Sequence, residues 1–240
     1  MANDNFWEHA WASQKKTEDT ELITIDTQRE ATDFSYKLLG DLKNKKLLEI
    51  GCGSGRQAIE LSQRGAQVTS IDIAGESVNA LQRKIKENKL KNIKVLKMNG
   101  ESLTFPNNSF DRVYINCVLM HADKDQVIPE SLRVLKKGGI LVFKETIKEW
   151  LFAFPYRTFS PFRKTEPHYV RLKDIKRLTK EHKEFCLLSK SSLVLVFGAR
   201  TFKFPMKLYN ALTTFDRVLL KRFPALRRIS WVSVAKVQKP

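Results

Sequence analysis

The chain has 240 residues, of which 42% are hydrophobic and 29% charged, so it is long and apolar enough to bury a core. Its first residues show no basic, apolar leader, and no stretch reaches the roughly 18 apolar residues that a membrane-spanning helix needs. The three cysteines stand far apart, which argues against a disulfide framework and against a zinc site. We therefore expect a cytoplasmic protein without a bound metal.

Strands and helices are predicted to alternate from residue 27 to residue 145. Apolar periodicity predicts an amphipathic helix at 27–42 and further helices at 57–64, 77–88 and 126–136, the last ending at Gly138 and Gly139. Short apolar runs between them predict strands at 46–50, 67–73, 93–99, 110–119 and 140–145. This alternation favours a doubly wound α/β fold, with a mostly parallel, seven-stranded, Rossmann-like sheet that is covered on both faces.

The pattern changes after residue 145. Residues 150–169 read as an irregular, aromatic insertion, followed by a helix at 172–181, a strand at 184–188, an amphipathic helix at 207–222 and a strand at 231–237. The sequence contains no internal repeat and no low-complexity linker. We expect a single domain over 1–240, with its core at 27–145, an elaboration at 146–230 and a last strand at 231–237.

The positive charge is concentrated in the C-terminal part. The net charge is +17; residues 1–149 hold 23 Lys and Arg against 21 Asp and Glu, a balance of +2, and residues 150–240 hold 20 against 5, a balance of +15. So basic a region suggests an anionic partner, either nucleic acid, anionic lipid head groups or a phosphorylated substrate. A basic surface in contact only with solvent has the same composition.

A glycine-rich turn follows the first predicted strand. The segment Leu48–Arg56 reads as strand, glycine turn and helix, and Asp72 lies at the end of the next strand. Glycines allow the backbone to approach a ligand, the helix N-terminus offers free N–H groups, and an acid at the end of the second strand can accept both ribose hydroxyls. A dinucleotide fingerprint would need a small residue where Arg56 stands, which disfavours a dehydrogenase.

The run LLEIGCGSGRQAIELSQRGAQVTSIDIAGESV resembles the first motif and its sequel in the class I S-adenosylmethionine-dependent methyltransferases, and MNGESLTFPNNSFDRVYINCVLMHADKDQVIPESLRVLKKGGILVFKE resembles the later motifs. The resemblance implies S-adenosylmethionine as cofactor, with Asp72 on the ribose, Ile73 against the adenine and Asn116 facing the cofactor. Asn99 stands where the family usually has an aspartate, but an amide can still bond the adenine amino group. The positions it assigns to the cofactor are Glu49, Gly51, Cys52, Gly53, Gly55, Asp72, Ile73, Asn99, Gly100, Glu101 and Asn116.

Methyl transfer in such a family is a direct in-line displacement, so a general base is needed only for an acceptor that is protonated at neutral pH. His121, after the fourth strand, is the first candidate, although it can equally be a loop histidine packed against the cleft. His168 is a second candidate, and Asp123 and Glu145 are weaker ones. Cys117 reads as a buried strand cysteine rather than as a nucleophile.

The acceptor is predicted from what surrounds the cofactor motifs. The Asn/Asp-Pro-Pro-aromatic motif of amino-group methyltransferases is absent, which favours methylation at oxygen or carbon. The insertion combines aromatic and basic side chains, which suit a lipid with an anionic head, stacked bases, a small acid, or merely a lid packed on the core. The candidate acceptor-binding residues are Trp150, Tyr156, Arg157, Arg163 and Tyr169.

Between residues 192 and 228, an apolar run and the amphipathic helix at 207–222 present apolar faces flanked by Arg and Lys. This pattern favours contact with an anionic membrane surface, although a helix that faces the core gives the same pattern. The predicted function is therefore methyl transfer to a small or lipid-like acceptor. Two alternatives remain: an RNA methyltransferase that uses the basic region, and a non-catalytic docking module that keeps the fold.

Overall fold

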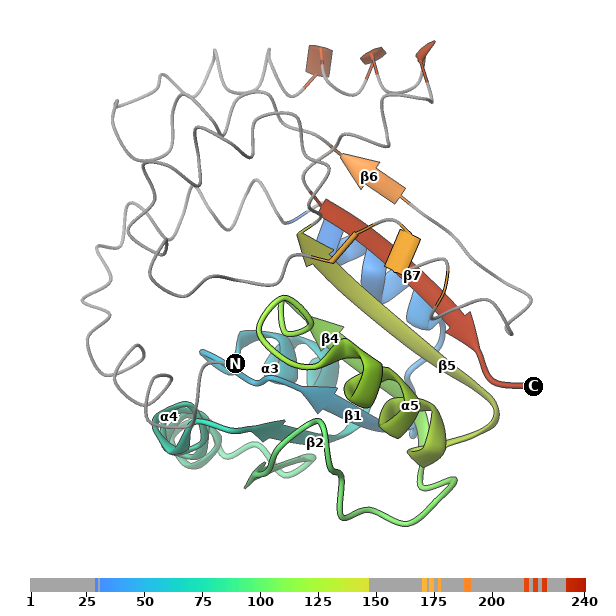
Figure 1. Ribbon diagram of the computed structural model, residues 1–240. Coiled ribbons are helices and arrows are strands. Elements are labelled where there is room, and N and C mark those ends of the chain that lie inside the picture. The colour runs from blue at the N-terminus through green and yellow to red at the C-terminus, as the bar shows by residue number, and fades with distance from the viewer. Residues whose placement is uncertain are drawn as a thin grey trace.

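The computed structural model describes residues 29, 31–146, 170–171, 173–174, 177, 188–190, 214–215, 218–219, 222–223 and 232–240. Within them, seven strands form one sheet in the order β3-β2-β1-β4-β5-β7-β6 (Figure 1). The strands are β1 (Lys46–Ile50), β2 (Gln67–Asp72), β3 (Ile93–Lys97), β4 (Phe110–Asn116), β5 (Leu135–Thr146), β6 (Leu188–Lys190) and β7 (Val232–Gln238). The helices between them are α3 (Arg56–Gln63), α4 (Gly75–Glu87) and α5 (Lys124–Val134), and a helical segment at 31–39 precedes β1.

The sheet has a parallel part and an antiparallel edge. Strands β1 to β5 pair in parallel, whereas β7 pairs antiparallel with both β5 and β6. The order reverses between β1 and β4, which are neighbours in the sheet although β2 and β3 separate them in the chain. In open sheets of this kind, ligands bind outside the carboxyl ends of the strands at the point of reversal.

Apolar layers cover both faces of the sheet, as the sequence predicts. On one face, Ala58, Leu81 and Leu39 bring α3, α4 and the segment 31–39 against Leu47, Val68 and Val142. On the other face, Val127, Ile128 and Val134 of α5 pack against Ile50, Ile115 and Phe143. The mostly parallel α/β fold is therefore confirmed, and α5 lies on the opposite face from α3 (Figure 1).

Two predicted boundaries around β4 and β5 are wrong. β4 stops at Asn116 instead of reaching residue 119, because Cys117 adopts a positive φ of 56° that no strand can continue. The predicted glycine end of α5 is also wrong: the helix ends at Val134, and β5 begins at once with Leu135. A register shift between Phe110 and Arg112 marks the irregular pairing there, and Gly138 donates its N–H to Lys239 O at 2.8 Å.

The other elements predicted between 27 and 145, and the last strand, agree with the structure to within a few residues. The strand expected at 184–188 is described only at 188–190, and of the helix expected at 207–222 only residues 214–215, 218–219 and 222 are described, all of them helical. Lys173, Asp174 and Arg177 are helical, as expected for 172–181. The insertion at 150–169 lies outside the described residues. Among the residues described, no helix is long and apolar enough to cross a bilayer.

Candidate functional site

The glycine turn lies at the carboxyl end of β1. Gly51, Gly53 and Gly55 have φ values of 85°, 48° and 78°, so the turn needs residues that tolerate the left-handed region. Gly51 N and Cys52 N both donate to Ile71 O, at 2.8 and 3.0 Å, which fixes the turn against β2. A Cβ on Gly51 would overlap Val118 Cγ2. The sequence predicts that another group approaches the backbone closely at Gly51. In the structure, the segment after β4 makes this close approach.

Asp72 ends β2 and binds the same turn. Its Oδ2 accepts from Gly53 N at 2.9 Å, and its Oδ1 accepts from Ala74 N at 3.0 Å. Burial raises the pKa of this carboxyl, and these two backbone hydrogen bonds oppose the increase. A carboxylate has about four lone-pair sites on its two oxygens, so Asp72 can accept further hydrogen bonds from a ligand.

Among the described residues, three buried carboxyl or amide oxygens at this edge have no hydrogen-bond partner: Glu49 Oε1 on β1, Asn116 Oδ1 on β4 and Glu145 Oε2 on β5. Glu49 is 1% exposed, its other oxygen accepts from Ser70 Oγ, and burial raises its pKa to about 8. Glu49 lies opposite Tyr114 in the register, and Asn116 lies two residues beyond Tyr114, so both side chains leave the same face of the sheet. Buried acceptors left open in this way suit a ligand that donates hydrogen bonds.

Glu145 holds the segment that follows β4. Its Oε1 accepts from Val118 N and Leu119 N, each at 2.9 Å, and burial raises its pKa to about 7. The same segment carries His121, whose backbone N–H donates to Val118 O at 2.8 Å. Burial lowers the pKa of His121 to about 4, so its imidazole is neutral at physiological pH. Glu145 thus positions the segment that carries the candidate base.

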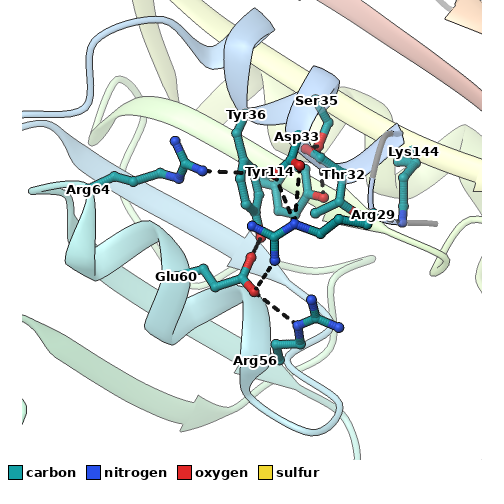
Figure 2. A network of polar contacts seen from close by, with 10 residues as sticks. All are labelled: Arg29, Thr32, Asp33, Ser35, Tyr36, Arg56, Glu60, Arg64, Tyr114 and Lys144. Atoms are coloured by element: carbon teal, nitrogen blue, oxygen red, sulfur yellow. Dashed lines mark hydrogen bonds and ion pairs between the residues drawn. The ribbon is translucent and has the colours of Figure 1, made fainter. Parts of the chain in front are cut away.

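Lys144 is a buried cation that the sequence analysis missed. It is 1% exposed, its Nζ donates to Thr32 Oγ1 at 3.0 Å, and burial lowers its pKa. The side chain belongs to a polar network between the sheet, the segment 31–39 and α3 (Figure 2). The sequence does carry a signal for this residue: the apolar run ILVFKE ends in two charged residues, Lys144 and Glu145. A strand that is covered on both faces rarely carries a charged residue without a partner.

Glu60 of α3 is the centre of the outer half of this network. Its Oε1 lies 2.9 Å from both Arg29 Nη1 and Arg56 Nε, and its Oε2 accepts from Tyr36 Oη at 3.0 Å. The contact with Glu60 fixes the side chain of Arg56, the first residue of α3, which occupies the position where a dinucleotide fingerprint needs a small residue (Figure 2). The contacts of Glu60 also tie the segment 31–39 to the helix that follows the glycine turn.

Comparison with known proteins identifies the family. Residues 48–143 match the family model described as a methyltransferase domain. A demethylmenaquinone methyltransferase of Geobacillus sp. (strain WCH70) is 30% identical over 162 residues, which cover 66% of this chain and 67% of that protein. The chain belongs to the class I S-adenosylmethionine-dependent methyltransferase family. The demethylmenaquinone methyltransferase of Geobacillus stearothermophilus is 32% identical over 154 residues, and there the match spans 64% of the relative's length, just under two thirds.

Solved structures of methyltransferases share the fold. Geranyl diphosphate C-methyltransferase from Streptomyces coelicolor A3(2) aligns with a TM-score of 0.65 over 97% of this chain and 88% of its own, at 14% identity. Phosphoethanolamine N-methyltransferase 2 of Haemonchus contortus, whose structure holds S-adenosylmethionine, aligns with a TM-score of 0.63 over 88% of this chain and 52% of its own, at 19% identity. At these identities the likeness concerns the fold alone.

Several of the predicted cofactor positions also have structural contacts of their own. Asn99 Oδ1 accepts from Glu101 N at 2.9 Å, and Glu101 Oε1 accepts from Asp123 N at 2.7 Å, so these side chains join the segment after β3 to the start of α5. Cβ atoms on Gly55 and Gly100 would lie 2.6 Å from Leu81 Cδ1 and 2.7 Å from Ile50 Cγ2. Both glycines are therefore required by packing, whatever they contribute to a ligand.

The remaining predicted site residues either have a structural role or lie outside the described residues. Asp123, a weaker candidate for the base, caps α5, because its side chain accepts from Asp125 N at 2.9 Å. The second candidate base, His168, lies outside the described residues. The same holds for the predicted acceptor-binding residues Trp150, Tyr156, Arg157, Arg163 and Tyr169.

Proposed function

We propose that the protein transfers the methyl group of S-adenosylmethionine to a small, lipid-like acceptor at oxygen or carbon. The observation that carries the proposal is the pair of open acceptors, Glu49 Oε1 and Asn116 Oδ1, at the point where the strand order reverses. S-adenosylmethionine has an ammonium group that donates hydrogen bonds and a ribose with two hydroxyls. The open acceptors fit the ammonium, whose positive charge would favour the ionised form of Glu49, and Asp72 fits the ribose, so the residues present suit this cofactor.

The remaining cofactor positions follow from the same placement. Gly51, Cys52, Gly53 and Gly55 form the turn that the methionine part would approach. Ile73 follows the ribose-binding acid, and the segment Asn99–Glu101 follows β3 beside it, where the adenine would lie. The cofactor supplies a methyl group that is already electrophilic on its sulfonium. The protein's task is to hold the acceptor in line with it and to exclude water.

His121 is the proposed general base. Burial lowers its pKa to about 4, so the imidazole is unprotonated in the neutral range, which is the form that a general base needs. Glu145 acts as a positioning residue, since it binds the backbone of the segment that carries His121. His168 stays a second candidate for the same role.

The acceptor class is supported by the names of similar proteins and by the sequence. The relatives are named for demethylmenaquinone, and one structural neighbour is named for geranyl diphosphate. The aromatic side chains of residues 150–169 suit an apolar acceptor, with Trp150, Tyr156 and Tyr169 beside it and Arg157 and Arg163 at its anionic end. The net charge of +15 over residues 150–240 favours one alternative function, an RNA methyltransferase.

A transfer assay tests the proposal directly. The protein is incubated with methyl-labelled S-adenosylmethionine and either demethylmenaquinone or total RNA. We expect label in the organic phase with the quinone, and Asp72→Ala should weaken cofactor binding about 10- to 100-fold, the effect of a lost hydrogen bond to a charged group. Asp111→Ala is a matched control, because Asp111 also binds a backbone N–H, that of Lys46, but at the opposite end of the strands. Label in RNA only, or equal effects of both substitutions, would overturn the proposal.

A further inference from the structure

Three large apolar side chains near the C-terminus face solvent. Phe215, Val218 and Phe223 are 56%, 61% and 54% exposed. Residues 214–215, 218–219 and 222 are helical, and Phe223 N donates to Leu219 O at 2.8 Å, the spacing of an α-helical hydrogen bond. In Figure 1 these residues lie beyond β6, far from the glycine turn.

The exposed residues share one side of the helix. Counted from Phe215, the positions 218, 219, 222 and 223 are the i+3, i+4, i+7 and i+8 positions, which fall on one face. That face therefore comprises Phe215, Val218, Leu219, Arg222 and Phe223, with Arg222 among the apolar side chains and itself exposed. The sequence left open whether this face packs on the core or faces outward, and the exposed fractions show that it faces outward.

We propose that this face docks on an anionic membrane surface. Exposed aliphatic and aromatic side chains with a basic residue among them are what a helix in the interfacial plane requires. Residues 150–240, which include this face, have a net charge of +15, and this charge complements anionic lipid head groups. Only the biological role of docking rests on the proposed function: a protein docked on a membrane meets a lipid-like acceptor there.

Other occupants of the face fit less well. A second copy of this chain would bring an equally basic region against the first, and like charges repel. Nucleic acid would match the charge but would leave Phe215, Val218 and Phe223 without an apolar partner, since phosphate contacts come from basic and polar groups. A bilayer interface satisfies both the charge and the apolar side chains.

Vesicle co-sedimentation of the full chain tests the docking face. The vesicles are phosphatidylcholine with or without phosphatidylglycerol. We expect binding only to the anionic vesicles, weakened about 10-fold or more in the triple variant F215S/V218S/F223S. Arg222→Glu should also weaken binding, whereas Lys94→Glu, the same charge change at an exposed position of β3, should have a much smaller effect. Circular dichroism confirms that each variant is folded.

Three results would overturn the docking proposal: binding of the triple variant equal to that of the wild type, equal effects of Arg222→Glu and Lys94→Glu, or a wild-type dimer that the triple variant converts to monomer. Titration of the same variants with S-adenosylmethionine separates this proposal from the proposed function. Unchanged cofactor binding with lost vesicle binding supports docking. Absence of cofactor binding in the wild type contradicts the proposed function and leaves the vesicle result intact.

Discussion

The carboxyl edge of β1, β4 and β5 buries charged side chains, whereas the face formed by Phe215, Val218, Leu219, Arg222 and Phe223 exposes apolar ones. Glu49, Lys144 and Glu145 are each 1% exposed or less, while Phe215, Val218 and Phe223 are more than half exposed. Both arrangements cost stability in an isolated protein. We therefore propose two kinds of partner: a polar, hydrogen-bonding ligand at the sheet edge and an anionic membrane surface at the C-terminal face.

The largest expected effect comes from filling the glycine turn. Gly51→Ala places a Cβ into Val118 Cγ2 at a residue with a φ of 85°. We expect the free energy of unfolding to fall by about 2–5 kcal/mol, from overpacking and backbone strain together. Urea unfolding measures it. The double variant G51A/V118A should recover the part due to overlap, and no recovery at all would mean that the turn does not meet the segment after β4 as described.

The next effect concerns the buried acid that positions the segment after β4. Glu145→Ala leaves Val118 N and Leu119 N without their acceptor, which should lower the free energy of unfolding by about 2–4 kcal/mol. Glu145→Gln keeps an acceptor oxygen and should cost less. The two variants compared by urea unfolding separate the acceptor from the charge, and equal losses would speak against the positioning role.

A third prediction concerns pH. Burial raises the pKa of Glu49 from 4.5 to about 8, so the folded protein keeps this proton over a range in which the unfolded chain loses it. The stability tied to Glu49 is therefore fully present below pH 4.5 and is lost as pH rises through 8. We expect the unfolding free energy of Glu49→Gln to fall less between pH 5 and pH 8 than that of the wild type. Parallel pH profiles would show that Glu49 is not buried as a proton-binding group.

The smallest expected effect on stability comes from a substitution in the exposed C-terminal face. Phe215→Ser removes an aromatic side chain that is 56% exposed, so we expect the free energy of unfolding to change by no more than about 0.5 kcal/mol. Thermal unfolding without lipid measures this change. A loss of several kcal/mol would mean that Phe215 packs on the protein, and the outward-facing helix would have to be abandoned.

The parts of the fold set by local pattern could be predicted from the sequence. Apolar runs and periodicity located every strand from β1 to β5, and the glycines with Asp72 located the turn that joins β1 to α3. The boundaries that failed depend on tertiary pairing. Cys117 carries no glycine-like signal for its positive φ, and Lys136 and Lys137 belong to β5 because Leu135 pairs with Phe110.

The candidate site was predictable in position but not in its buried polar contacts. The resemblance of the motifs placed Glu49, Asp72 and Asn116 at one edge, where the structure has them. Lys144 was missed because its partner, Thr32, lies 112 residues away in the chain, a distance that no local pattern spans. The hydrogen bonds that Val118 N and Leu119 N donate to Glu145 likewise depend on the register between β4 and β5.

Isothermal titration of the wild-type protein with S-adenosylmethionine, S-adenosylhomocysteine and NAD is the most direct test of the central claim, that the open acceptors beside the glycine turn hold a methyl-donor cofactor. We predict that the first two bind and that NAD does not. Binding of NAD alone, or binding of none of the three, would contradict the assignment of this edge to S-adenosylmethionine.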